Sequence, residues 1–418
     1  MLIAGEASGD LLAAELVAAL RDRLPEADYF GAGGPRMAGA GVELVHDMSH
    51  LAILGVTDVL AKLLELHRLM NQLLATAIER QPDVIIGVDY GGFNLRFGHA
   101  IKEHVRNNPF SKWNPKLVQF VSPQVWASRP GRAWRIAEDY DLLLSIFPFE
   151  KDWYAQRVPN LRVEFVGHPM VGRFARHGLS PAGRETVTTV APNRPAQIVL
   201  LPGSRKSELH RHLPVMLDAL NIIQGEWPQV KARMILPGER LLKIVSRELA
   251  RRAGGQPGFS GVPTLADTES LAQRVVPNLE IQIGKLPEAL EQADIAISKT
   301  GTVTMECAFF GVPAVTGYKT SWLNYQIARC IITVKTITMP NLLAQAEVYP
   351  EFLQNDLTAE NVARAALELL RDEGRRQKVK SQLTRVIASL GEPGAPKRAA
   401  DAILTLLEEP PSGRRQVS

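Results

Sequence analysis

The run Val84-Ile85-Ile86-Gly87-Val88 is followed directly by Asp89-Tyr90-Gly91-Gly92-Phe93-Asn94, and an amphipathic stretch covers residues 100–106. Consecutive apolar residues of this kind are typical of a strand that is buried on both faces of a parallel sheet. The loop that follows has turn-forming glycines and a carboxylate, and a helical pattern lies beyond it. This stretch therefore predicts an α/β fold built on parallel strands.

The same strand-loop-helix unit recurs along both halves of the chain. Further apolar runs lie at residues 2–4, 117–121 and 142–146, and then at 198–201, 232–236 and 295–298. Between Met170 and Gln197 the sequence is rich in Gly, Pro, Arg and Thr and has little periodicity, which is typical of a linker. We therefore expect two Rossmann-like, doubly wound α/β domains that face a cleft.

The length of 418 residues also favours two domains. We expect an N-terminal Rossmann-like domain at residues 1–175, a linker at 176–196 and a C-terminal Rossmann-like domain at 197–370. C-terminal helices are expected at 371–408, with a break near residues 391–396, and a disordered tail at 409–418.

Composition excludes several classes of protein. The two cysteines form no CxxC pair, and no pattern of paired metal ligands is present, so we expect no disulfide framework and no metal site. No secretory signal or long apolar run is found, which favours a cytoplasmic protein. The net charge of +4 fits an anionic membrane surface, a phosphorylated substrate or nucleic acid, but it fits a solvated basic surface equally.

Ligands in open parallel sheets bind at the carboxyl ends of strands, so the loops after the apolar runs are the candidate sites. The turn at residues 5–10 could present backbone N–H groups to a sugar or a phosphate, or it could be a tight turn with a helix N-cap. Asp89 is a candidate general base for an attacking hydroxyl, with a helix N-cap as the alternative.

Two loops of the second half suit an anionic leaving group. Gly203, Ser204 and Arg205 open a helix, where N–H groups and a guanidinium could stabilise a departing diphosphate without a metal. Gly301 and Thr302 form a second turn of this kind, and Glu306 could accept hydrogen bonds from ribose hydroxyls. A capped helix and a carboxylate that complements a helix dipole are the alternatives for these loops.

Residues 58–80 carry a wider apolar surface than one core-facing stripe needs. Together with residues 51–56, this helix could contact acyl chains or the bilayer interface, with Lys62 and Arg68 at lipid phosphates. A fully buried helix is the alternative.

Taken together, the motifs resemble the lipid-A-disaccharide synthase family over about residues 4–390. The resemblance rests on residues 4–10, Gly-Gly-Pro-Arg-Met at 33–37, Val-Ser-Pro-Gln-Val-Trp-Ala at 121–127, Phe-Pro-Phe-Glu-Lys at 147–151, Phe-Val-Gly-His-Pro at 165–169, residues 201–208 and Pro-Asn-Leu-Leu-Ala at 340–344. It implies a GT-B type, inverting, metal-independent glycosyltransferase without a cofactor. The N-terminal domain would bind the acceptor and acyl chains, and the C-terminal domain the UDP-sugar.

The implied reaction transfers 2,3-diacylglucosamine from its UDP derivative to the 6-hydroxyl of 2,3-diacylglucosamine 1-phosphate. The products are the β-1,6-linked lipid A disaccharide 1-phosphate and UDP. The resemblance places such an enzyme at the cytoplasmic face of the inner membrane, with no nucleic-acid partner and with a homodimer as an option. By position, Asp89 is similar to the family's general base, Arg205 to a phosphate contact and Glu306 to a nucleotide contact. Further substrate-binding candidates are Glu6, Ser8, Asn94, Ser122, His168 and Asn341, where His168 could instead be a hinge.

The sequence departs from the family's usual pattern at three places. Gly91-Gly92 replace a Pro-Asp pair beside Asp89, Lys299 stands where a small residue is common, and Trp322 replaces a proline. Because of Gly91-Gly92, a non-catalytic paralogue that binds lipid or nucleotide-sugar is one competing hypothesis. The other is a UDP-sugar enzyme of the same architecture, such as an N-acetylglucosaminyl transferase or a 2-epimerase.

Overall fold

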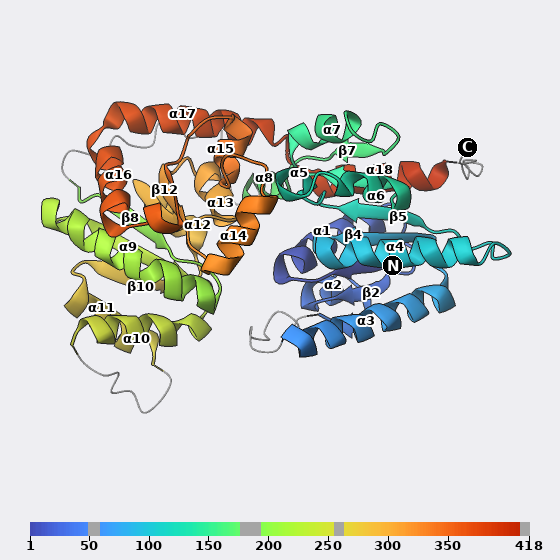
Figure 1. Cartoon of the computed structure of the whole chain (residues 1–418), viewed down its shortest axis with the longest axis horizontal. Coiled ribbons are helices and arrows are strands. Elements are labelled where there is room, and N and C mark those ends of the chain that lie inside the picture. The colour runs from blue at the N-terminus through green and yellow to red at the C-terminus, as the bar shows by residue number, and fades with distance from the viewer. Residues whose placement is uncertain (49–58, 176–193, 255–262, 410–418) are drawn as a thin grey trace. The chain divides into compact units, whose positions relative to one another are not determined.

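The computed structural model of the chain describes residues 1–48, 59–175, 194–254 and 263–409, with the backbone alone for 59–63. It divides into two compact units, Met1–Gly178 with Leu390–Ser418, and Leu179–Ser389 (Figure 1). Each unit has one parallel sheet with helices packed on it, so the predicted fold class is confirmed. Most of the expected linker and tail, and the apolar residues 51–56, lie outside the described residues.

The first unit contains a seven-stranded parallel sheet in the order β3-β2-β1-β4-β5-β6-β7. Its strands are β1 (Leu2–Ala4), β2 (Phe30–Gly33), β3 (Glu43–Asp47), β4 (Val84–Val88), β5 (Lys116–Phe120), β6 (Leu142–Ser145) and β7 (Val163–Phe165). Its helices are α1 (Ala7–Arg21), α2 (Pro35–Gly39), α3 (Val59–Arg80), α4 (Gly91–Asn107), α5 (Val125–Ser128), α6 (Arg132–Asp139), α7 (Pro148–Ala155), α8 (Pro169–Ala175) and α18 (Ala395–Glu408). The apolar runs at 2–4, 84–88, 117–121 and 142–146 thus became the central strands, as predicted.

The core of this unit lies where α3, α4 and α6 cover the sheet. Phe93 and Phe97 of α4 stack on each other and are buried with Leu69 and Leu73 of α3. In its described turns α3 therefore presents an ordinary core-facing stripe, and Leu64 is its exposed large apolar residue. Residues 51–56 and the side chain of Lys62, part of the proposed lipid contact, lie outside the described residues.

Asp10 joins two segments that the sequence presents as separate motifs. Its buried carboxylate accepts hydrogen bonds from the backbone N–H groups of Gly34, Arg36 and Met37, at 2.8–3.0 Å. A carboxylate at a helix N-terminus satisfies free donors and complements the helix dipole. Asp10 therefore caps α2 and fixes it beside the start of α1.

The last helix of the chain belongs to the first unit. α18 packs against α1, β5 and β6, and Arg23 of the turn after α1 pairs with Asp401. Arg398 donates from its guanidinium to the carbonyl oxygens of Val166, Glu392 and Pro393. The chain therefore crosses from the second unit back to the first between α17 and α18.

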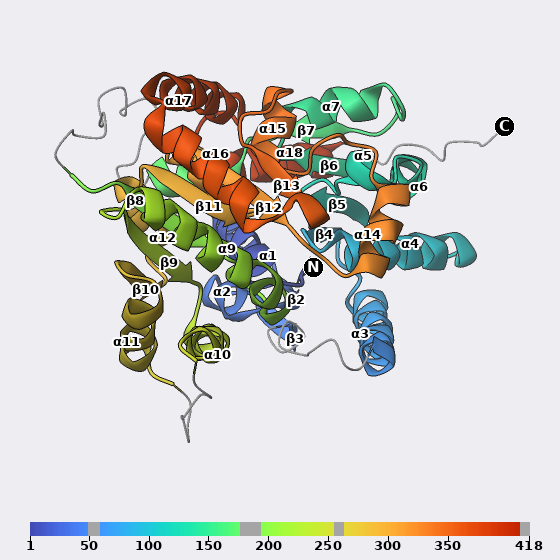
Figure 2. The same ribbon diagram turned by 60° about the vertical axis from the view of Figure 1, so that its left-hand side comes forward.

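The second unit contains a six-stranded parallel sheet in the order β10-β9-β8-β11-β12-β13. Its strands are β8 (Gln197–Leu201), β9 (Lys231–Leu236), β10 (Leu279–Ile283), β11 (Ile295–Lys299), β12 (Ala314–Tyr318) and β13 (Glu351–Leu353). Its α-helices are α9 (Lys206–Glu226), α10 (Leu242–Arg252), α11 (Leu265–Val275), α12 (Leu286–Gln292), α13 (Val303–Phe309), α14 (Trp322–Ile331), α15 (Met339–Ala344), α16 (Ala359–Arg371) and α17 (Glu373–Ser389), and its 3₁₀ helices are η2 (Glu239–Leu241) and η3 (Gln354–Asp356). α9 and α16 pack together on one face of the sheet (Figure 2).

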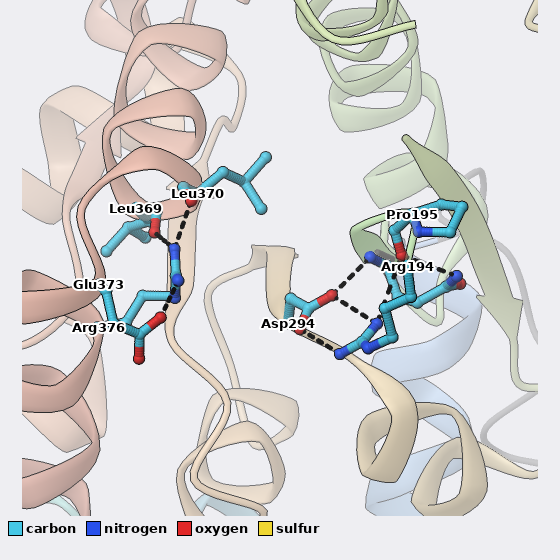
Figure 3. A network of polar contacts seen from close by, with 8 residues as sticks. Arg194, Pro195, Asp294, Leu369, Leu370, Glu373 and Arg376 are labelled. Carbon is cyan, nitrogen blue, oxygen red and sulfur yellow. Dashed lines mark hydrogen bonds and ion pairs between the residues drawn. The ribbon is translucent and has the colours of Figure 1, made fainter. Parts of the chain in front are cut away.

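Two arginines join neighbouring segments of the second unit. One lies at the amino ends of the strands, and the other lies where α16 meets α17. Arg194 forms a bidentate pair with Asp294, which also accepts the backbone N–H of Gln197 at 2.8 Å (Figure 3). This pair joins the start of β8 to the residue before β11. Arg376, which is 5% exposed, donates to the carbonyl oxygens of Leu369 and Leu370 and pairs with Glu373 (Figure 3).

Candidate active site

In both sheets, the strand order reverses beside the first strand of the unit. The chain builds outward from β1 to β3 and then returns to β4 on the other side of β1, and β8 and β11 stand in the same relation. Open α/β sheets bind ligands at such a reversal, outside the carboxyl ends of the two strands. We name the loops after β1, β4 and the neighbouring β5 the first strand edge (residues 5–6, 89–90 and 121–122). The loops after β8 and β11 are named the second strand edge (residues 202–205 and 300–302).

Asp89 directly follows β4 on the first strand edge. Asp89 and Tyr90 both have left-handed backbones, with φ of 50° and 44°, and the Asp89 N–H donates to Phe120 O at 2.8 Å. Burial raises the pKa of the Asp89 carboxyl, the backbone N–H of Tyr90 lowers it, and the charge of Glu6 raises it further. A carboxylate with a raised pKa at a strand end suits a general base.

The turn after β1 lies beside Asp89. Glu6 occupies the N-cap position of α1 and Ser8 its first turn, and both are exposed. A Cβ on Gly5 would lie 2.3 Å from the ring of Tyr90, so Gly5 leaves the space that this ring occupies. The structure therefore brings Glu6 and Asp89 together on adjacent strands, as the reversal of strand order requires.

Asn94 and Ser122 face inward. Asn94 is 2% exposed and donates from Nδ2 to the carbonyl oxygens of Asp89 and Ile3. Ser122 is buried too, and its hydroxyl donates to Tyr154 Oη at 3.3 Å. Both side chains therefore form hydrogen bonds inside the protein that hold the loops of the first strand edge in place.

His168 follows β7 and contacts the returning end of the chain. Its backbone N–H donates to Leu390 O at 2.9 Å, and its Nδ1 accepts the N–H of Met170, so the ring proton resides on Nε2. Burial, with a smaller contribution from Arg173, lowers the pKa of His168 to about 4. The ring is therefore neutral at physiological pH and lies at the crossing between the chain's two passes through this unit.

Glu208 organises the second strand edge. Its Oε2 accepts the backbone N–H groups of Ser204 and Arg205, at 2.9 and 3.3 Å, and its Oε1 pairs with Lys299 at 3.1 Å. Lys299 and these two backbone N–H groups hold the pKa of Glu208 below its usual value against the effect of burial. The sequence predicted that backbone N–H groups of this loop face a ligand, but those of Ser204 and Arg205 donate to Glu208 instead. The side chain of Arg205, by contrast, is exposed.

Gly203 and Gly301 make room for this arrangement. Gly203 has a φ of 130°, and a Cβ there would lie 2.6 Å from Glu208, while a Cβ on Gly301 would lie 2.7 Å from Lys299 Nζ. Thr302 is exposed at the N-cap position of α13, and Glu306 is half-buried one turn further on. The second strand edge therefore contains five of the six predicted nucleotide-site residues, and Glu306 lies on the helix that follows it. Four of the five surround the Glu208–Lys299 ion pair, namely Gly203, Ser204, Arg205 and Gly301.

The Asn341 side chain forms hydrogen bonds within its own loop. Its Nδ2 donates to Tyr349 O at 2.8 Å, and its Oδ1 accepts the N–H groups of Val348 and Tyr349. The side chain is 2% exposed. Its described contacts hold the segment that leads into β13.

Among the described residues, no three His, Cys, Asp or Glu side chains lie close enough together to hold a metal ion. Within the same residues, no helix is long and apolar enough to span a bilayer.

Sequence reasoning missed the role of Gln119, which donates from Nε2 to Asp89 O at 2.9 Å. The signal available was an amide in the middle of the apolar run 117–121, opposite a glycine in the run 84–88. A polar side chain in a strand buried on both faces needs a hydrogen-bond partner, and here the partner is the backbone carbonyl oxygen of Asp89, the candidate base.

Comparison with known proteins agrees with this geometry. The solved structures of a putative UDP-N-acetylglucosamine 2-epimerase from Listeria monocytogenes (TM-score 0.58, 13% identity, 98% of this chain and 96% of that one) and of the calicheamicin glycosyltransferase CalG4 (TM-score 0.57, 14% identity, 98% and 99%) share the fold. This is the two-domain GT-B architecture. At such low identity the likeness concerns the fold alone.

Sequence comparison is more specific. The profile of a family described as lipid-A-disaccharide synthetase matches residues 1–249 and 265–405. A lipid-A-disaccharide synthase of Myxococcus xanthus is 34% identical over 416 residues, which cover 99% of this chain and 98% of that protein. Together with the GT-B fold, these matches identify a glycosyltransferase that uses a UDP-sugar and a lipid substrate. The chain belongs to the lipid-A-disaccharide synthase family.

Proposed function

We propose that Asp89 is the general base with which this glycosyltransferase joins its two acylated glucosamines. The 6-hydroxyl of 2,3-diacylglucosamine 1-phosphate attacks the anomeric carbon of UDP-2,3-diacylglucosamine, and Asp89 takes the proton of that hydroxyl. The hydroxyl attacks from the face opposite the diphosphate, and the bond from the anomeric carbon to the diphosphate oxygen breaks with its electron pair leaving on UDP, so the configuration inverts. The observation that carries this role is a half-buried carboxyl with a raised pKa at the strand reversal of the first unit.

The second strand edge is proposed to receive the UDP. Arg205, Ser204, Gly203, Gly301 and Thr302 would contact the diphosphate, and Glu306 the ribose. The exposed Arg205 side chain at the N-terminus of α9 supports this role, because a guanidinium there would stabilise negative charge that develops on the leaving group. We expect the reaction to need no metal ion.

Contact with a lipid surface is proposed as well. α14 has no buried residue, and Trp322 and Leu323 on it are 73% and 62% exposed, with Arg329 exposed on the same helix. An exposed tryptophan, aliphatic side chains and a cation suit acyl chains at an anionic bilayer. We propose peripheral association with the cytoplasmic face of the inner membrane. Binding of Glu6, Ser8, Asn94, Ser122, His168 and Asn341 to substrate, directly or through their loops, and dimerisation are further proposals.

The competing hypothesis of a non-catalytic paralogue rests on Gly91-Gly92. These residues form the first turn of α4, and a Cβ on Gly92 would meet no atom within 4 Å. In this chain α4 therefore begins at Gly91 without a second carboxylate, and Asp89 still directly follows β4. The catalytic reading is favoured for this reason.

The test incubates the purified protein in EDTA with both substrates and follows the disaccharide 1-phosphate by mass spectrometry. Product and UDP from the wild type, and no product from Asp89→Asn, would support the proposal. Full activity of Asp89→Asn would remove Asp89 from the base role, and a folded wild type that binds UDP without forming product would favour the paralogue.

A further inference from the structure

Gln119 is a buried amide in a strand that is otherwise apolar. It is 0% exposed and lies between Val118 and Phe120, which are equally buried. Its Nε2 donates to Asp89 O at 2.9 Å and also lies 3.3 Å from Val121 O and 3.4 Å from Phe120 O. The side chain therefore joins the ends of β4 and β5, the strands that carry Asp89 and Val121.

A second amide holds the same carbonyl oxygen. Asn94 Nδ2 donates to Asp89 O at 2.9 Å, so this carbonyl accepts from two side chains and both of its lone pairs are used. A Cβ on Gly87 would lie 2.5 Å from Gln119 Oε1 and 2.9 Å from Asn94 Cβ. The glycine in the middle of β4 is thus what allows both amides to reach Asp89.

The residues that these amides hold have unusual backbones. Asp89, Tyr90 and Val121 have φ of 50°, 44° and 68°, a region that non-glycine residues seldom adopt and β-branched residues avoid. Such conformations persist only where surrounding contacts enforce them. Two strained turns at adjacent strand ends are here tied together by one glutamine.

Stability alone does not explain the two amides. Within the described residues, Gln119 Oε1 and Asn94 Oδ1 are buried and have no hydrogen-bond partner. Each unpaired oxygen carries a desolvation cost that an apolar side chain would avoid. The two amides therefore lower the stability of the fold, while their Nδ2 and Nε2 groups hold the backbone of Asp89.

We propose that Gln119 and Asn94 are positioning residues for Asp89, whose carbonyl oxygen they hold so that its carboxylate stays at the end of β4. Both side chains are buried, so in this proposal they act on the substrate through Asp89 and its loop. This inference rests on the proposed role of Asp89 as general base.

The test compares Gln119→Met, which keeps the side-chain volume and removes the donor, with Val118→Ala, a core change on the same strand. In Gln119→Met we expect kcat to fall about 100-fold, the cost of displacing a reacting group by about 1 Å, with KM little changed. Val118→Ala should lose stability and keep kcat. In an Asp89→Asn background, Gln119→Met should change the residual rate by less than about twofold, because it acts through Asp89.

Wild-type kcat in Gln119→Met, or an equal loss in the Asp89→Asn background, would overturn the positioning role. A crystal structure of Gln119→Met separates this failure from that of the proposed function. If the wild type forms no product, or if Asp89→Asn is fully active, the base assignment fails. The φ of Asp89 in the variant still decides the positioning role, since a move out of the left-handed region supports it and an unchanged backbone overturns it.

Discussion

The indole N–H of Trp126 donates a hydrogen bond to Glu150 Oε1 at 2.9 Å, and the Ser145 hydroxyl lies 2.7 Å from Glu150 Oε2. Glu150 is 0% exposed and burial raises its pKa to about 7, against the opposing effect of these hydrogen bonds. The pair ties α5, which follows the loop of Ser122, to the start of α7. Glu150, a titratable group, thus helps to hold α5, the helix that follows residues 121–122 of the first strand edge.

Replacing Glu150 by Gln should make stability less dependent on pH. Between the ordinary pKa of 4.5 and the folded value of about 7, the folded state binds more protons than the unfolded state, so wild-type stability falls as pH rises through this range. A shift of this size corresponds to roughly 3 kcal/mol, and Gln, which does not titrate, avoids that loss. Urea unfolding at about pH 5 and about pH 8 measures the difference. Glu103→Gln, at an exposed position on α4, is the control. A stability difference between Glu150→Gln and wild type that is the same at both pH values would contradict the expectation.

Replacing Glu6 by Gln should move the pH profile of the reaction. Asp89 acts as a base only when ionised, so the rate should rise with pH through its pKa. The negative charge of Glu6 contributes to raising that pKa, after burial, and its removal should shift the acidic limb of kcat to lower pH. The control is Glu26→Gln, an exposed carboxylate of the same unit. An acidic limb that does not move would contradict the coupling between Glu6 and the group that titrates in the reaction.

Replacing Arg205 by Ala should weaken the binding of UDP but not of uridine. A lost hydrogen bond to a charged phosphate costs about 1.5–3 kcal/mol, which is about 10- to 150-fold in Kd. Lys206→Ala is the matched control, because it removes an exposed cation from the next position. Calorimetry with both ligands gives the comparison, and an equal loss for UDP and uridine would assign Arg205 to the fold of the loop.

Local features of the sequence were sufficient for the central strands. The runs at 2–4, 84–88, 198–201 and 295–297 are apolar throughout, and a strand covered on both faces requires this pattern. Strand β2 lacks such a run because Gly31 and Gly33 lie in it. A Cβ on Gly31 would lie 1.8 Å from Leu2 O, so only the neighbouring strand explains this glycine.

The candidate site was predictable as a set of loops and not as a set of contacts. Asp89, Arg205 and Glu306 stand where the sequence pattern ends a strand or begins a helix, and this position is a local property. By contrast, Glu208 takes the backbone N–H groups of its own loop, and Lys299, which reaches it from β11, is 91 positions away in the chain.

The sequence by itself determined the class of fold, the strand-end loops and the family, because hydrophobic periodicity and turn chemistry depend on neighbours along the chain. Tertiary structure alone decided that β1 lies beside β4 and β8 beside β11, that Gln119 and Asn94 meet at Asp89 over Gly87, and that α18 returns to the first unit. These relations join residues that are far apart in sequence. They arise only when buried polar groups and apolar faces find partners in the folded chain.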